Sequence, residues 1–199
     1  MTRGWPTTLS SGRVGLRPIA RGDRDGWSEA RERNAGWLAP WEATPPRDPG
    51  PALTFAAMVR ELRRQARRGS TLPFVVTYDD VLVGQLTVGG ITYGSLCSAH
   101  IGYWIDSRVA GRGIMPTAVA LAVDHCFLML RLHRVEVNIR PENVASLRVV
   151  EKLGFREEGL RRSFLHISGE WRDHRSFALT ADEVPHGLLA RWQNSRPAG

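Results

Sequence analysis

The chain has 199 residues, 42% hydrophobic and 24% charged, a composition that excludes a disordered protein. Its formal net charge is +7 and Lys152 is its only lysine, so the positive charge is almost all arginine, which suits a phosphate-bearing ligand, an acidic protein, nucleic acid or simply a solvated surface. Two cysteines are too few for a disulfide framework, no apolar stretch is long enough to span a membrane, and the polar residues 1–13 include no secretory signal. We expect one cytoplasmic domain over residues 1–199.

The first part of the chain predicts a strand followed by two helices. Residues 13–17 form the expected strand, and Asp23 is a suitable N-cap for a helix that ends near Asn34. The proline-rich segment 40–51 is expected to be a loop. Apolar residues recur at a helical period over residues 51–68. The opposite face of this second helix carries Arg60, Arg63, Arg64, Arg67 and Arg68.

The rest of the chain alternates strands and helices. We expect strands at 74–78, 81–88, 99–105 and 135–139, helices from Ile114 and over 143–153, and closing strands from Phe155 onward. Gly154 followed by Phe155 is typical of a Schellman motif, in which Phe155 can contact Val150. Single helices between strands predict an α/β (α+β) domain with a mixed sheet.

The most informative segment is IGYWIDSRVAGRGIMP, residues 101–116. A strand leads through a loop with Gly111 and Gly113 directly into a helix, whose first N–H groups have no partner within the helix and attract anions. The glycines allow a phosphate to approach the backbone, and Arg108 and Arg112 add positive charge. The turn therefore predicts a diphosphate site.

Three kinds of phosphate loop were compared with this turn. A P-loop sequence is absent, and the dinucleotide fingerprint requires a third glycine where Pro116 stands. The strand at 135–139 also ends in Arg140 rather than in an acidic residue that would hold a ribose. Residues 108–113 match Arg/Gln-x-x-Gly-x-Gly/Ala in full, and this pattern is the coenzyme A loop of the GNAT acetyltransferases.

A second motif strengthens this resemblance. Asn143-x-x-Ser146 opens the expected helix, which closes with Lys-Leu-Gly-Phe. Together with Val14-Gly-Leu-Arg-Pro, the segment 37–41 and the segment 171–174, these motifs resemble the RimJ/RimL branch of the GNAT family over most of the chain. The resemblance implies a mostly antiparallel sheet with splayed central strands and helices on both faces. It also implies direct transfer of acetyl from acetyl-CoA to a primary amine, with a ribosomal protein N-terminus as the expected acceptor.

The resemblance further assigns roles to individual residues. It places Arg108, Gly111, Arg112, Gly113 and Ile114 around the diphosphate, mainly through backbone N–H groups, and Trp104, Ile105 and Asp106 beside the pantetheine arm. It brings the Asn143 side chain to the pantetheine amide, although spacing alone explains Asn143 as a helix N-cap. It makes Ser146 the proton donor to the departing thiolate. Neither the family nor the spacing of histidines and cysteines implies a metal.

The sequence offers two candidates for the general base. His100 occupies the strand position where many GNAT enzymes have a glutamate, and a histidine exchanges protons near neutral pH, although a lone strand histidine is more often structural. Glu42 is an equal candidate for the general base. The alternative is that Glu42 is an ordinary loop carboxylate exposed to solvent. A glutamate considered for this role in RimL-type proteins aligns with Leu165 here.

Two further functions compete with acetylation of a protein N-terminus. Acetylation of a cationic small amine, such as an antibiotic or polyamine, would be favoured by an acidic groove built from Glu29, Glu32, Glu42 and Asp106. The arginine face of the helix at 51–68 could instead dock on ribosomal RNA. Trp37, Trp41 and Trp171 are candidates for the wall of the acceptor groove, with core packing as the alternative.

Overall fold

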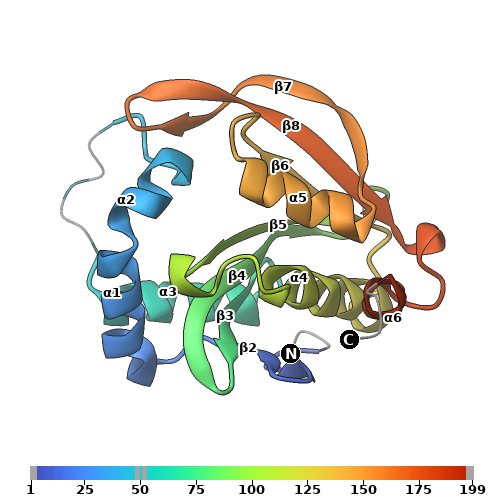
Figure 1. Ribbon diagram of the computed structural model, residues 1–199, viewed down its shortest axis with the longest axis horizontal. Coiled ribbons are helices and arrows are strands. Elements are labelled where there is room, and N and C mark those ends of the chain that lie inside the picture. The colour runs from blue at the N-terminus through green and yellow to red at the C-terminus, as the bar shows by residue number, and fades with distance from the viewer. Residues whose placement is uncertain (1–3, 48–49, 51–52, 196–199) are drawn as a thin grey trace.

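The computed structural model describes residues 4–47, 50 and 53–195, and their strands form one eight-stranded sheet (Figure 1). The strands lie in the order β1-β2-β3-β4-β5-β6-β8-β7. Their bounds are β1 Leu9–Ser11, β2 Val14–Pro18, β3 Leu72–Tyr78, β4 Val81–Thr92, β5 Ser98–Ile105, β6 Arg134–Ile139, β7 Arg156–Ile167 and β8 Glu170–Thr180. The helices are α1 Arg24–Arg33, α2 Ala35–Leu38, α3 Phe55–Arg67, α4 Ile114–Asp124, α5 Val144–Leu153 and α6 Leu188–Asn194. None of the helices in these described ranges is long and apolar enough to cross a membrane.

The centre of the sheet opens between β5 and β6. These two strands are the parallel neighbours in a sheet whose other pairs are antiparallel, and their register runs only from Ser98↔Arg134 to His100↔Glu136. Beyond His100, β5 continues to Ile105 without a partner on β6. This divergence confirms the predicted splay of the central strands.

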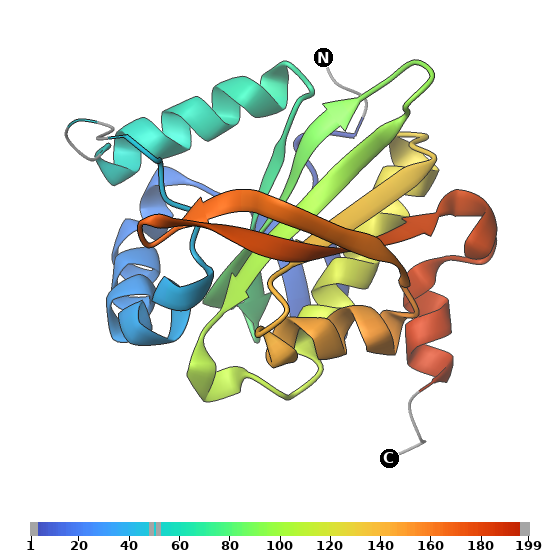
Figure 2. The same cartoon turned by 90° about the horizontal axis from the view of Figure 1, so that it is seen from above.

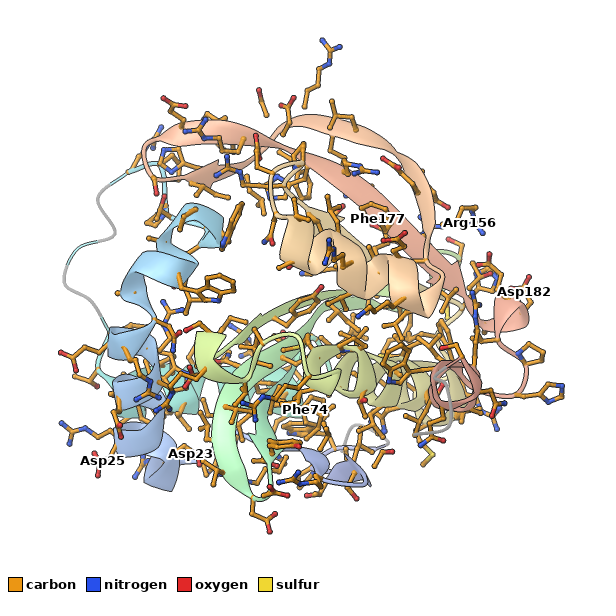
Figure 3. The ribbon with its side chains drawn as sticks, in the orientation of Figure 1. Asp23, Asp25, Phe74, Arg156, Phe177 and Asp182 are labelled. Atoms are coloured by element: carbon orange, nitrogen blue, oxygen red, sulfur yellow. The ribbon has the colours of Figure 1, made fainter. Side chains whose placement is uncertain are left out.

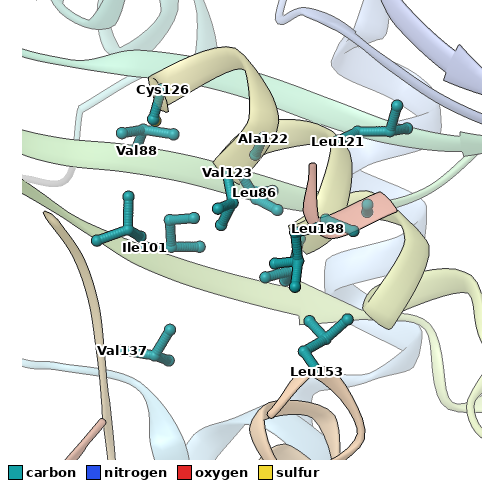
Figure 4. Close-up of a cluster of buried hydrophobic side chains, with 14 of the residues drawn as sticks. Leu86, Val88, Ile101, Leu121, Ala122, Val123, Cys126, Val137, Leu153 and Leu188 are labelled. Atoms are coloured by element: carbon teal, nitrogen blue, oxygen red, sulfur yellow. The ribbon is translucent and has the colours of Figure 1, made fainter. Parts of the chain in front are cut away.

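Helices cover both faces of the sheet because residues along a strand point alternately to its two sides. On β3, Phe74 belongs to the large core beneath α4, whereas the adjacent Val75 packs with Val59 of α3 on the other face. Helix α4 is buried nearly all round, since the sheet, α5 and α6 surround it. Figure 4 shows side chains of β4 and β5 meeting those of α4, with Leu153 of α5 close by. The predicted α/β fold with helices on both faces is confirmed.

The β7–β8 hairpin extends beyond this core. Seen from above, it crosses over the sheet from the side of α6 toward the side of α1 and α2 (Figure 2). At its far end the amide of Thr44 donates to the carbonyl oxygen of His166 at 2.8 Å, which ties the chain after α2 to the hairpin. The α1–α2 segment and the hairpin are therefore connected on one side of the opening between β5 and β6.

Most predicted boundaries hold, and Asp23 is the N-cap residue of α1 as predicted, but its side chain makes no capping bond. Helix α1 begins after Asp23 as expected (Figure 3), but the Asp23 carboxylate is bonded to Arg17 and to the amide of Ala20 instead of to helix amides. The predicted start of α3 at residue 51 lies outside the described residues, and the helix begins at Phe55. The Schellman end of α5 is confirmed by a 3.0 Å bond from the Phe155 amide to the Val150 carbonyl.

Candidate active site

A cavity of about 750 Å³ lies where the splayed sheet meets α4 and α5. One wall is the end of β5 and the turn into α4, a second is one face of α5, and a third is the segment from Gly36 to Glu42. Cavities of this size commonly hold small-molecule ligands. Trp104, Ile105, Gly111, Gly113, Ile114, Asn143, Ser146 and Glu42 from the sequence-derived candidates line it.

The turn into α4 has the backbone geometry of an anion site. Gly111 and Gly113 have φ of 81° and 79°, in the left-handed region where glycine is favoured. The amide of Thr117 makes the first turn's bond, to the Gly113 carbonyl at 3.2 Å, so the N–H groups of Ile114 and Met115 precede the intrahelical ladder. A Cβ placed on Gly111 would meet no atom within 4 Å, so the space beside the backbone is open to a ligand.

Asp106 holds this turn in shape from inside the protein. It is 1% exposed, and its carboxylate accepts from Arg33 Nη2 and Arg108 Nη2, each at 2.8 Å, and from the Arg108 amide at 3.0 Å. Burial alone would raise the pKa of Asp106, but these hydrogen bonds hold it well below its usual range. The side-chain oxygen of Asn34 accepts from the next amide, Ser107. Asp106, Arg108 and Arg112 do not line the cavity.

Asn143 and Ser146 lie together at the start of α5. The Asn143 Oδ1 accepts from the Ser146 amide at 3.1 Å, which confirms Asn143 as the helix N-cap. The Tyr103 hydroxyl donates to the Ser146 carbonyl at 3.4 Å, and burial raises the pKa of this tyrosine, which stays protonated at neutral pH. Sequence reasoning did not select Tyr103, although alternation along β5 places it on the face opposite His100 and Trp104.

Aromatic and charged residues gather at the other end of the cavity. The Arg31 guanidinium lies 5.6 Å from the ring centre of Trp27 and 5.5 Å from that of Trp104, and it donates to the Glu42 carboxylate. Trp37 and Trp41 line the cavity, whereas Trp171 packs against His166 instead. This end of the cavity therefore has an apolar wall that contains one ion pair, Arg31–Glu42.

Residues 13–156 match the family model of the acetyltransferase (GNAT) domain. The chain belongs to this family. It is 31% identical to the Escherichia coli [Ribosomal protein uS5]-alanine N-acetyltransferase over 174 residues, which cover 83% of this chain and 87% of that protein. The probable N-acetyltransferase YjcK of Bacillus subtilis is 45% identical over 101 residues, 51% of this chain and 56% of that relative. The solved structure of Mycobacterium smegmatis RimJ in complex with CoA-disulfide superimposes with a TM-score of 0.92 at 40% identity, covering 98% and 97% of the two chains.

This acetyltransferase takes its acetyl group from acetyl-CoA, whose thioester supplies the activated acyl carbon. The residues present fit that coenzyme, because the open turn at Gly111 and Gly113 offers unpaired amides to a diphosphate. The unpartnered end of β5 exposes backbone groups along the same cavity. Among the described residues, no cluster of histidine, cysteine, aspartate or glutamate could hold a metal ion.

In this acetyltransferase, His100 does not line the cavity. On β5 it stands opposite Glu136 of β6, with its ring against Gly89 and Gly90. Burial lowers the pKa of His100 and so does Arg161, whereas Glu136 raises it, and the net shift is downward. His100 is therefore neutral at pH 7. Leu165 lies on β7 and is not part of the cavity either.

Proposed function

We propose that this acetyltransferase acetylates the N-terminal α-amine of a protein, with a ribosomal protein as the first acceptor to test. The observation that carries the proposal is a cavity that joins an anion-binding turn at one end to a tryptophan-lined pocket at the other. The relative from Escherichia coli that aligns over most of the chain is an acetyltransferase of ribosomal protein uS5. That relationship supports the same class of acceptor here.

The chemistry of the cavity favours an α-amine over a lysine side chain. Deprotonating an α-amine of pKa ~7.8 at pH 7 costs roughly 1 kcal/mol, whereas a lysine of pKa ~10.4 costs nearly 5 kcal/mol. The two carboxylates in the described lining are Glu42 and Glu142, which are paired with Arg31 and Arg140. Because neither is a free strong base, the site suits an amine that needs little help, and positioning supplies most of the rate.

Within this proposal, the described residues divide the work along the cavity. The amides after Gly111 and Gly113 bind the diphosphate, and the exposed backbone of Trp104 and Ile105 pairs with the pantetheine arm. The N–H group near Ile105 stabilises the thioester oxygen as negative charge develops on it. Ser146 donates the proton to the departing thiolate.

We propose either Glu42 or His100 as the general base, and these two side chains lie in different surroundings. Glu42 lines the cavity but shares its carboxylate with Arg31. His100 is neutral at pH 7, as a base must be, but it needs a water chain to reach the amine because it lies outside the lining. The two alternatives predict that kcat falls in only one of the variants His100→Gln and Glu42→Gln.

Acetylation of a cationic small amine has less support from the same contacts. Of the four acidic residues that could form an attracting groove, Glu29 is paired with Arg33, Asp106 with Arg33 and Arg108, and Glu42 with Arg31. Only Glu42 of these lines the cavity. Three of the four charges are therefore already paired with arginines of the protein, and Glu32 does not line the cavity.

A second candidate function is docking on ribosomal RNA through α3. Its arginine face is exposed, its single acidic residue Glu61 is paired with Arg64, and no residue of α3 lines the cavity. The two functions can therefore operate together. Binding to a ribosomal RNA fragment should weaken steeply with salt, and reversing Arg60 and Arg63 to glutamate should flatten that dependence. An unchanged slope would remove this candidate.

The acceptor is tested by incubating ribosomal proteins and free polyamines with the enzyme and labelled acetyl-CoA. Intact-mass analysis followed by peptide mapping locates the label. Label at protein N-termini with unmodified lysines supports the proposal. Label on the polyamines alone would replace it with the small-amine alternative.

A further inference from the structure

The tryptophan wall of the cavity, residues 36–42, has little packing of its own. Among these residues, all of which the structure describes, only Leu38 is buried, whereas Trp37 and Trp41 line the cavity and stay partly exposed. A segment with so few buried contacts opens locally at a low cost in free energy. The shape of the tryptophan wall therefore depends on contacts from other parts of the chain.

Arg140 supplies such contacts from the loop between β6 and α5. Its Nη1 donates to the carbonyl oxygen of Pro40, 100 positions earlier in the chain, at 2.7 Å. Its guanidinium lies 5.5 Å from the ring centre of Trp41, and its Nε donates to Glu142 Oε2 at 3.1 Å. With the Arg140 side chain only 13% exposed, one guanidinium joins the tryptophan wall to the loop that leads into α5.

Arg140 can affect the cavity only through its neighbours. It does not line the cavity, whereas all three of its partners do. A guanidinium combines directional donors with a flat face, so Arg140 fixes both the backbone before Trp41 and the tilt of the Trp41 ring. The next residue, Glu42, is held by Arg31 of α1. Two arginines from separate elements thus hold two consecutive residues of the tryptophan wall.

We propose that Arg140 is a positioning residue for the acceptor, which sets the affinity for the acceptor amine by holding the tryptophan wall against the start of α5. The inference rests on the proposed function, in which the tryptophan-lined end of the cavity receives the acceptor. Gly111 and Gly113 lie on a different wall of the cavity. Loss of the Arg140 contacts should therefore leave coenzyme binding unchanged.

Steady-state kinetics of the full chain with acetyl-CoA and a synthetic N-terminal peptide of ribosomal protein uS5 tests this role. Arg140→Met keeps an apolar stem but removes the donors, so it should raise the KM for the peptide roughly 10-fold, with kcat changed by less than about twofold. Arg140→Lys restores the charge and a donor without the flat face, and it should recover part of the loss. Calorimetry should show wild-type affinity for coenzyme A in both variants.

Arg175→Met is the matched control. The Arg175 guanidinium also lies over an aromatic ring, that of Phe177 at 5.3 Å, and its Nε donates to Glu157 at 2.7 Å, but Arg175 and both partners lie outside the cavity lining. This variant should keep the wild-type KM for the peptide. An unchanged KM in Arg140→Met, an equal rise in Arg175→Met or a parallel loss of coenzyme A binding would each overturn the inference.

Hydrogen exchange measured by mass spectrometry gives a second readout that needs no acceptor. The amides of residues 36–42 should exchange roughly 10-fold faster in Arg140→Met than in the wild type, with the sheet unaffected. Unchanged exchange in these residues, or faster exchange throughout the protein, would overturn the inference. Absence of transfer to the peptide by the folded wild type would contradict the proposed acceptor instead, and hydrogen exchange would then decide whether Arg140 holds the tryptophan wall.

Discussion

Replacing Asp106 with asparagine tests whether charge holds the coenzyme turn in place. The substitution keeps the shape of the side chain and an oxygen that can still accept from the Arg108 amide, but it weakens the 2.8 Å bonds from Arg33 and Arg108. Hydrogen bonds to charged groups contribute roughly 1.5–3 kcal/mol each. The side chains of Arg33 and Arg108 are 28% and 63% exposed and regain water, so we expect a total loss of only about 2 kcal/mol.

The pH dependence of this loss identifies its cause. The pKa of Asp106 is lowered in the folded state, so its contribution is complete above the unfolded value of ~3.9 and disappears as the pH falls through the lower folded value. Urea unfolding followed by tryptophan fluorescence should show a constant deficit for Asp106→Asn between pH 7 and pH 5, which shrinks below about pH 4. A deficit below about 0.5 kcal/mol at pH 7, or one that is independent of pH, would show that the charge of Asp106 does not hold the turn.

Four other substitutions test the proton donor, the general base and the turn after α5. Ser146→Ala should lower kcat roughly 10- to 100-fold without changing the affinity for coenzyme A, and an unchanged kcat would remove Ser146 as the proton donor. Of His100→Gln and Glu42→Gln, the one that removes the base should lower kcat roughly 10- to 100-fold, whereas an unchanged kcat in both would assign deprotonation to water. Gly154→Ala should destabilise the fold by about 1–2 kcal/mol in urea, because Gly154 has φ of 68° and the Arg191 guanidinium occupies the space beside it, and an equal midpoint would contradict that strain.

The parts of the fold that local signals determine were predictable from the sequence. The glycine turn that opens α4, the Asn143 cap and the stop at Gly154 each depend on neighbours within a few residues, and the structure confirms all three. The short strand β1 and the helix α6 were missed, because elements of so few residues have too little periodicity to detect. Their positions depend on tertiary contacts, such as the one from Asp124 that caps the amide of Leu188.

The site was less predictable, because its side chains are positioned by residues far away in the chain. Asp106 was expected beside the pantetheine arm, but Arg33 approaches it from a helix 73 positions earlier, and no local pattern reveals that pairing. The Arg31–Glu42 ion pair and the contact between Tyr103 and Ser146 likewise join separate elements. His100 follows the expected strand alternation, but its distance from the cavity depends on where β5 and β6 part.

If the open glycine turn binds the diphosphate of coenzyme A, Gly111→Asn should weaken coenzyme binding, and calorimetry measures this loss. Asparagine tolerates the left-handed backbone and its Cβ would meet no atom within 4 Å, so it places a side chain in the ligand's path without disturbing the fold. Gly12→Asn is the control, since Gly12 also has positive φ and open space but lies outside the cavity. The wild type and the control should bind coenzyme A, with at least about a tenfold loss of affinity for Gly111→Asn. Wild-type affinity in Gly111→Asn, or no binding by the folded wild type, would contradict this role of the glycine turn.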